Sequence, residues 1–229
     1  RVHDMLSTIS SRDSQCSVES DRVRILSVIR ETVGFARLDS LVFERYRAWA
    51  IHVSLDALNS SVDEEERLKL LRSVGSLYMM QGKCFQAEKY VQDLVEETKG
   101  AFGNDHPDTL TSIQNLALVY HAQGHYGKAQ RLYETCLERR KVILGENHPD
   151  TLQCMNHLGV LFYNQGKYGR AQLQLEACLK TGLAVLGRHD VGVMTSMKHL
   201  AVVYAKQGND GDAEALFRRC RKGQQKIFA

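Results

Sequence analysis

Apolar residues recur along most of this chain at spacings of three and four, which is the pattern of helices that bury one face. In the clearest example, a tight turn at Gln-Gly separates two such runs of apolar positions. The apolar positions before this turn are Leu110, Ile113, Leu116, Ala117 and Tyr120. Those after it are Ala129, Leu132, Tyr133, Cys136 and Leu137. The pattern predicts two antiparallel helices, which we call helix A and helix B.

The Gln-Gly dipeptide recurs every 42 residues, and a fixed period of this size indicates an array of repeated helix pairs. An aromatic residue, a small residue and an alanine keep the same phase in every copy. The small residue lets helices A and B approach closely. The dipeptides occur at 81–82, 123–124, 165–166 and 207–208. The small residues are Gly75, Ala117, Gly159 and Ala201.

The connectors between repeats predict where helices end and begin. Residues 103–109 and 145–151 share the pattern Gly-x-x-His-Pro-Asp-Thr. Glycine suits the end of helix B, and proline suits the first turn of the next helix A. The connector before the fourth unit lacks the proline, but Asp190 can cap the helix that follows. No other metal ligand accompanies His106 and His148, so these histidines are expected to cap helices or face solvent.

The period also divides the chain. Residues 1–20 are rich in serine and charge and are expected to form a flexible or contact-ordered lead. Residues 21–60 carry two helical stripes and are expected to cover the apolar face of the first repeat as an N-terminal cap. Four repeat units then follow, at 61–102, 103–144, 145–186 and 187–229.

Composition and charge narrow the function classes. The 229 residues are 43% hydrophobic and 25% charged, as in ordinary folded proteins, and no apolar run is long enough for direct membrane insertion. A net charge of +3 is too small to indicate nucleic-acid binding. Residues 1–98 hold 13 basic and 16 acidic side chains, whereas residues 99–229 hold 17 and 11. The later repeats therefore favour an acidic partner, although a solvated helix surface would show the same excess.

The six cysteines do not indicate a metal site, because no Cys-x-x-Cys is present. Cys136, Cys178 and Cys220 share one phase of the repeat, which predicts small side chains packed between helices. Free packing cysteines indicate a reducing compartment, either the cytoplasm or an organelle. An organelle would require that a targeting segment was removed, which a chain beginning at Arg1 leaves open. No metal or cofactor is expected.

The helix–turn–helix unit with these small, aromatic, glycine and alanine positions resembles the tetratricopeptide repeat. The His-Pro-Asp-Thr-Leu connector, the triplet at 115–117 and Gln-Gly-His-Tyr at 123–126 resemble the kinesin-light-chain type. Similar repeats occur in nephrocystin-like proteins. The resemblance covers residues 63–227. It implies an all-α, right-handed superhelical array of antiparallel helix pairs whose A helices line a concave groove.

The resemblance also implies which side chains face this groove. They mix amides, imidazoles and cations, which can pair with a peptide backbone and with carboxylates; the alternative is that they are simply solvated. We predict partner binding at Lys69, Arg72, Ser76, Thr111, Gln114, Asn115, His121, Gln153, Asn156, His157, Tyr163, Lys198, His199 and Lys206.

The sequence also bears on catalysis, RNA binding and a structural role. The chain has no glycine-rich phosphate loop, no His-Glu-x-x-His and no Gly-x-Ser-x-Gly, so catalysis is not expected. Helical arrays that read RNA have shorter units and a strongly basic groove. The expected function is a scaffold or adaptor that binds a peptide or protein segment. The alternative is a permanent structural subunit of a large assembly, and the oligomeric state stays open.

Overall fold

The structure is a computed structural model that describes residues 35–60 and 63–227. The chain forms two compact units, Arg1–Val53 and Ser54–Ala229. The predicted lead at residues 1–20 and the predicted cap helix at residues 21–33 lie outside the described residues. The division into lead, cap and repeats therefore stays a prediction.

The long helix α3 (Phe35–Asn59) includes the stripe of apolar residues between positions 38 and 53. Tyr46 and Trp49 on this helix are exposed, and their ring centroids lie 5.7 Å apart. Within the second unit, Leu58 near the end of α3 packs against a small cluster that contains Leu68 and Leu94.

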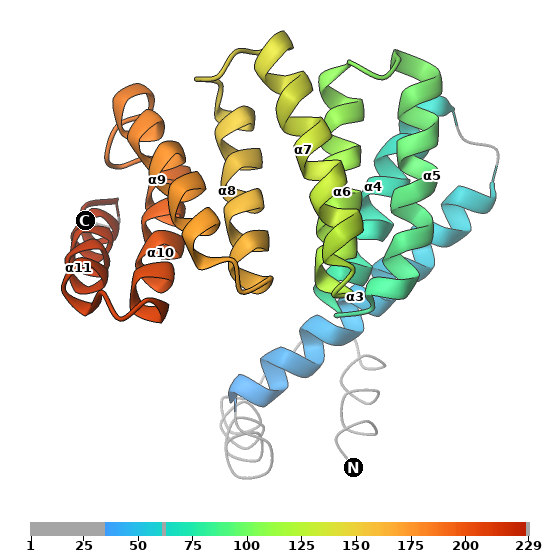
Figure 1. Cartoon of the computed structure of the whole chain (residues 1–229). Coiled ribbons are helices and arrows are strands. Elements are labelled where there is room, and N and C mark those ends of the chain that lie inside the picture. The colour runs from blue at the N-terminus through green and yellow to red at the C-terminus, as the bar shows by residue number, and fades with distance from the viewer. Residues whose placement is uncertain (1–34, 61–62, 228–229) are drawn as a thin grey trace, which may run out of the picture. The chain divides into compact units, whose positions relative to one another are not determined.

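The repeat region consists of consecutive helix pairs, and Figure 1 shows the two helices of each pair running antiparallel. Each helix of the region packs against its neighbours in the chain. The A helices are α4 (Glu64–Met80), α6 (Pro107–Ala122), α8 (Pro149–Asn164) and α10 (Val191–Lys206). The B helices are α5 (Cys84–Phe102), α7 (Tyr126–Ile143), α9 (Tyr168–Val185) and α11 (Asp210–Ile227). The predicted all-α repeat array is confirmed.

The Gln-Gly dipeptides form the turns from helix A to helix B, as predicted. Each glycine of the four dipeptides has a positive φ, between 71° for Gly82 and 80° for Gly208. A side chain on that backbone would be strained, whereas glycine adopts it freely. Each turn therefore depends on its glycine, and this explains why the dipeptide marks the period.

Each A helix that follows a connector starts with a side-chain cap. Nδ1 of His106 and Nδ1 of His148 each accept a hydrogen bond at 3.2 Å from the backbone N–H two residues later. Asp190 Oδ1 accepts from Val193 N at 3.0 Å. The expected capping roles are confirmed, and the two histidines need no metal to explain them.

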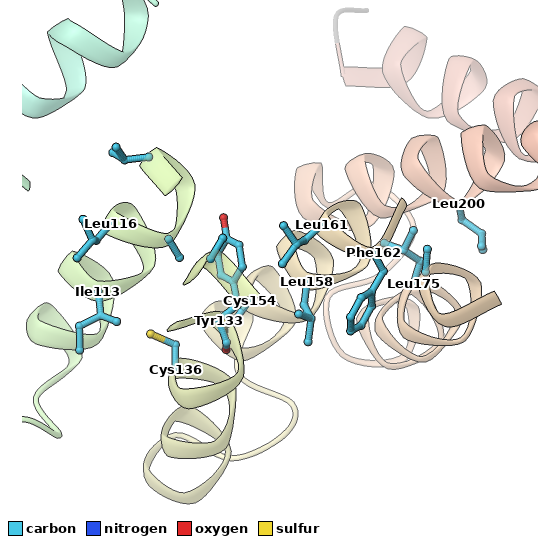
Figure 2. Close-up of a cluster of buried hydrophobic side chains, with 14 of the residues drawn as sticks. Ile113, Leu116, Tyr133, Cys136, Cys154, Leu158, Leu161, Phe162, Leu175 and Leu200 are labelled. Carbon is cyan, nitrogen blue, oxygen red and sulfur yellow. Dashed lines mark hydrogen bonds between the residues drawn. The ribbon is translucent and has the colours of Figure 1, made fainter. Parts of the chain in front are cut away.

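The core fills the space between successive helices, and Figure 2 shows part of it around Tyr133, Cys136 and Cys154. A Cβ added to Gly159 would lie 2.6 Å from Leu175 Cγ, so helices α8 and α9 require a small residue there. The phased cysteines are buried, and the thiol of each donates to a backbone carbonyl of the preceding A helix. These pairs are Cys136–Leu110, Cys178–Leu152 and Cys220–Met194. The packing role predicted for them is confirmed.

Candidate partner-binding site

The fourteen residues predicted to bind a partner all lie on the A helices. Each helix presents them from one stretch of its length. They are Lys69, Arg72 and Ser76 on α4; Thr111, Gln114, Asn115 and His121 on α6; Gln153, Asn156, His157 and Tyr163 on α8; and Lys198, His199 and Lys206 on α10.

Their exposure is uneven. Gln114 and Asn156 are buried, with 3% and 7% of their surface exposed. These two amides are therefore positioned beneath the surface instead of on it. The six exposed members are Lys69, Arg72, Ser76, Gln153, Lys198 and Lys206. The remaining six are half-buried.

The cations differ in whether a carboxylate neutralises them. Lys69 pairs with Glu65 on its own helix, and this pairing raises the pKa of the lysine. Arg72 Nη2 lies 3.8 Å from Asp108 Oδ1 on the next A helix. Lys198 and Lys206 form no ion pair with any residue that the structure describes. Among the predicted binding residues, the cations without an ion pair are therefore those on α10.

Polar contacts connect neighbouring A helices. Gln114 Nε2 donates to Gln153 Oε1 at 3.3 Å, and His199 Nδ1 lies 2.9 Å from Asn156 Oδ1. His121 Nε2 lies 2.6 Å from Asn164 Nδ2. These contacts restrain the side chains and would reduce the entropy that they lose on binding a ligand.

A buried arginine on a B helix completes this network. Arg140 of α7 is only 2% exposed. Its guanidinium donates to Gln114 Oε1, to Thr111 Oγ1 at 3.2 Å and to the carbonyl of Asp150 at 2.8 Å. All three acceptors are neutral, and no described carboxylate forms an ion pair with it. Sequence reasoning missed this residue because it considered only A-helix positions.

Two half-buried histidines keep the middle of the site neutral near pH 7. His157 stacks on Tyr133, with ring centroids 5.8 Å apart and planes 7° apart. Burial, together with the positive potential of His199, His121 and Arg140, lowers the pKa of His157 to about 4. Burial and the charge of Lys198 lower the pKa of His199. Both imidazoles therefore act as neutral hydrogen-bonding groups.

A cavity of about 430 Å³ opens between α8, α9 and α10. Four of the fourteen predicted residues line it, namely Gln153, Asn156, His157 and His199, and Thr195 on α10 lines it as well. Leu152, Cys178 and Val193 contribute apolar surface, while Asp150 and Asp190 contribute carboxylates. Its size lies within the range of roughly 300–1,000 Å³ typical of ligand pockets. The structure thus joins residues of the third and fourth repeats into one concave site.

Among the described residues, no group of three potential ligands is arranged to hold a metal ion. Within the same part of the chain, no helix has the length and apolar character needed to cross a membrane.

The geometry defines an array of helix-pair repeats with a cavity between α8, α9 and α10. Models of the tetratricopeptide repeat match residues 66–141, 126–183 and 193–228. The chain belongs to the tetratricopeptide repeat family. Comparison with curated proteins found no significant match.

Solved structures of low sequence identity share the fold. BtubC (BKLC) from P. vanneervenii is 19% identical, with a TM-score of 0.65 over 92% of this chain and 85% of that one. A putative kinesin light chain from P. anserina is 22% identical, with a TM-score of 0.65 over 88% and 96%. PlcR of Bacillus thuringiensis, in complex with the peptide PapR7 and DNA, is 11% identical, with a TM-score of 0.64 over 84% and 68%. The kinesin-light-chain resemblance of the repeats thus extends to the fold.

Proposed function

We propose that this protein is a non-catalytic scaffold or adaptor that binds a peptide or protein segment in the groove lined by its A helices. The observation that carries the proposal is the 430 Å³ cavity between α8, α9 and α10, which gathers predicted binding residues from two repeats. Its apolar floor and convergent polar groups are typical of a recognition site.

The side chains around the cavity suit an extended segment. The amides of Gln153 and Asn156 offer donors and acceptors that match a peptide backbone. His157 and His199 are neutral, so they add hydrogen bonds without charge. PlcR, which shares the fold, was solved with a bound peptide. Such a segment would lie across α8 and α10.

An acidic region of the partner would complement α10. Lys198 and Lys206 are exposed and carry charge that the described residues do not neutralise. The partner is a protein or peptide, not a nucleic acid, because the overall charge of +3 is small.

A reducing compartment is proposed because Cys84, Cys136, Cys154, Cys178 and Cys220 are free thiols.

Charge reversal on α10 tests this proposal. Lys198→Glu is expected to weaken binding of the captured partner about tenfold at low salt, mainly by slowing association. Lys180→Glu, at an exposed position on helix α9, is the matched control and should leave affinity nearly unchanged. Surface plasmon resonance with the purified partner measures both rates. Equal losses in the two variants would exclude the A-helix groove as the binding face.

A permanent structural subunit is the second candidate function. It is favoured by large apolar side chains exposed on the B helices: Phe85 at 73%, Val142 at 86% and Leu173 at 70%. A fixed neighbour could cover these side chains. Stoichiometric co-purification with the same partners through high salt would identify a subunit, whereas reversible micromolar binding would identify an adaptor.

A further inference from the structure

The repeat period relates the buried arginine of one unit to an empty position in the next. Arg140 occupies the same phase as Gly182, which lies 42 residues later on helix α9. In the first unit this phase is held by Thr98. A long cationic side chain therefore extends from this phase in the second unit. In the third unit the same phase carries no side chain.

The residues around this space lie at equivalent phases of the two units, although their types differ. Arg140 donates to Thr111, Gln114 and the carbonyl of Asp150. Adding 42 to each number gives Gln153, Asn156 and Gly192, and all three line the 430 Å³ cavity. Gly182 lines it as well. The cavity is thus lined by residues at the same phases as those that hold the arginine side chain one repeat earlier.

We propose that this cavity binds the guanidinium group of an arginine side chain from the partner, in the place that Arg140 takes one repeat earlier. The inference rests on the proposed function and specifies the anchor of the bound segment. Lys198 and Lys206, outside the cavity, remain available to acidic residues elsewhere on that segment.

The acceptors needed by a guanidinium are present. Asn156 and Gln153 carry side-chain amide oxygens, and Gly192 offers a backbone carbonyl, the same kinds of neutral oxygen that satisfy Arg140. Asn156 is one methylene shorter than its counterpart Gln114, which leaves room for a group that enters from outside. Planar guanidinium forks match several such acceptors at once.

The acidic residues around the cavity suit a cation. Asp150 and Asp190 both line the cavity. The counterpart of Asp190 in the preceding unit is His148, whereas the counterpart of Gly192 is Asp150, so one carboxylate is gained and one is lost. One oxygen of Asp190 caps α10 through Val193 N, which fixes the carboxylate at the cavity wall.

Opposing charges lie at the edges. Arg140 contacts the carbonyl of Asp150, and Lys198 adjoins His199 closely enough to lower the pKa of that imidazole. Both histidines of the cavity are neutral near pH 7 and add no repulsion. The residues that line the cavity thus include two aspartates and no lysine or arginine.

A capped tripeptide, acetyl-Gly-Arg-Gly-amide, provides the test with the full chain. Its titration is expected to give saturable NMR shifts at Asn156 and His199 and to lower the pKa of His199, as the charge of Arg140 lowers that of His157. The same peptide with citrulline is neutral and nearly isosteric, and it should bind at least about tenfold more weakly. Equal binding of the two peptides, or no shifts with either, would overturn the proposal.

Two variants separate the site from the fold. Gly182→Arg, combined with Val193→Ala, places an arginine at the phase of Arg140 and should abolish peptide binding by filling the cavity. The second substitution is needed because a Cβ at position 182 would lie 2.9 Å from Val193 Cγ2. Asp190→Asn keeps the helix cap, tests the charge without changing the volume and should weaken binding about tenfold. Undiminished binding in folded Asp190→Asn would contradict the electrostatic basis.

The source of the guanidinium is tested with free L-arginine. The capped tripeptide should bind at least as tightly, because a partner segment has no free α-ammonium or α-carboxylate. A clear preference for free arginine would overturn the assignment to a protein partner and indicate an amino-acid site. If the tripeptide does not bind while Lys198→Glu still weakens partner binding, the proposed guanidinium anchor is wrong. Partner binding in the A-helix groove would still be supported.

Discussion

Replacing Arg140 with alanine is expected to lower the free energy of unfolding by about 2–4 kcal/mol, because it leaves a cavity and unpaired buried acceptors. The side chain is 2% exposed and connects α7 to α6 and α8 through three neutral oxygens. Chemical denaturation monitored by circular dichroism measures the change. The variant should also increase the mobility of the Gln114 side chain, because its amide oxygen loses the hydrogen bond from Arg140.

Arg139→Ala is the matched control. Arg139 is the preceding residue on the same helix, but its guanidinium is 40% exposed and pairs with exposed Asp105. Surface pairs of this kind contribute about 0–1 kcal/mol. Arg140→Met combined with Gln114→Leu should recover at least about 1 kcal/mol relative to Arg140→Ala, because packing is restored and the orphaned amide is removed. A loss below about 1 kcal/mol for Arg140→Ala would show that the buried arginine is not structural.

Acidification below pH 6.5 is expected to destabilise the repeat region by about 3 kcal/mol through His157. The pKa of this histidine is about 4 in the folded chain, against 6.5 for the free side chain. The unfolded chain therefore binds the proton more readily between these two values. The contribution of neutral His157 to the free energy of unfolding is complete above pH 6.5. It declines as the pH falls towards 4 and is lost below pH 4.

Unfolding free energies measured from pH 7 to pH 4 check this effect. His157→Phe keeps an aromatic ring against Tyr133 but cannot titrate, so its stability should fall less steeply with acid than that of the unchanged chain. His121 and His199, whose pKa values are also lowered by burial, should account for part of the remaining slope. An unchanged slope in His157→Phe would mean that this histidine is not the acid-sensitive group.

Local rules made the repeat predictable. Positive φ at the Gln-Gly glycines, capping by Asp190 and close approach at Gly159 each depend on residues near one another in sequence or one helix apart. The 42-residue period then transfers each position to the other units. The helices, their turns and the packing of the phased cysteines therefore follow from the chain without knowledge of distant contacts.

The chemistry of the site was less predictable. Charged residues are rarely buried, so nothing in the local pattern indicated that Arg140 lies inside while its neighbour Arg139 lies near the surface. Likewise, Gln114 is buried because its partner is an arginine from another helix. One sequence signal was available. The residue type at the phase shared by Thr98, Arg140 and Gly182 differs in every unit, which indicates that this position has a role besides packing of the repeat.

Site-specific photocross-linking tests the central claim, that a partner segment lies against the A helices at the cavity. Benzoylphenylalanine would be placed at Thr195, which lines the cavity, and in a second variant at Val142, which is 86% exposed on helix α7. The expected result is a covalent partner adduct from position 195 that acetyl-Gly-Arg-Gly-amide suppresses, with no adduct from position 142. Adducts from position 142 alone would contradict the account and assign partner binding to the B helices.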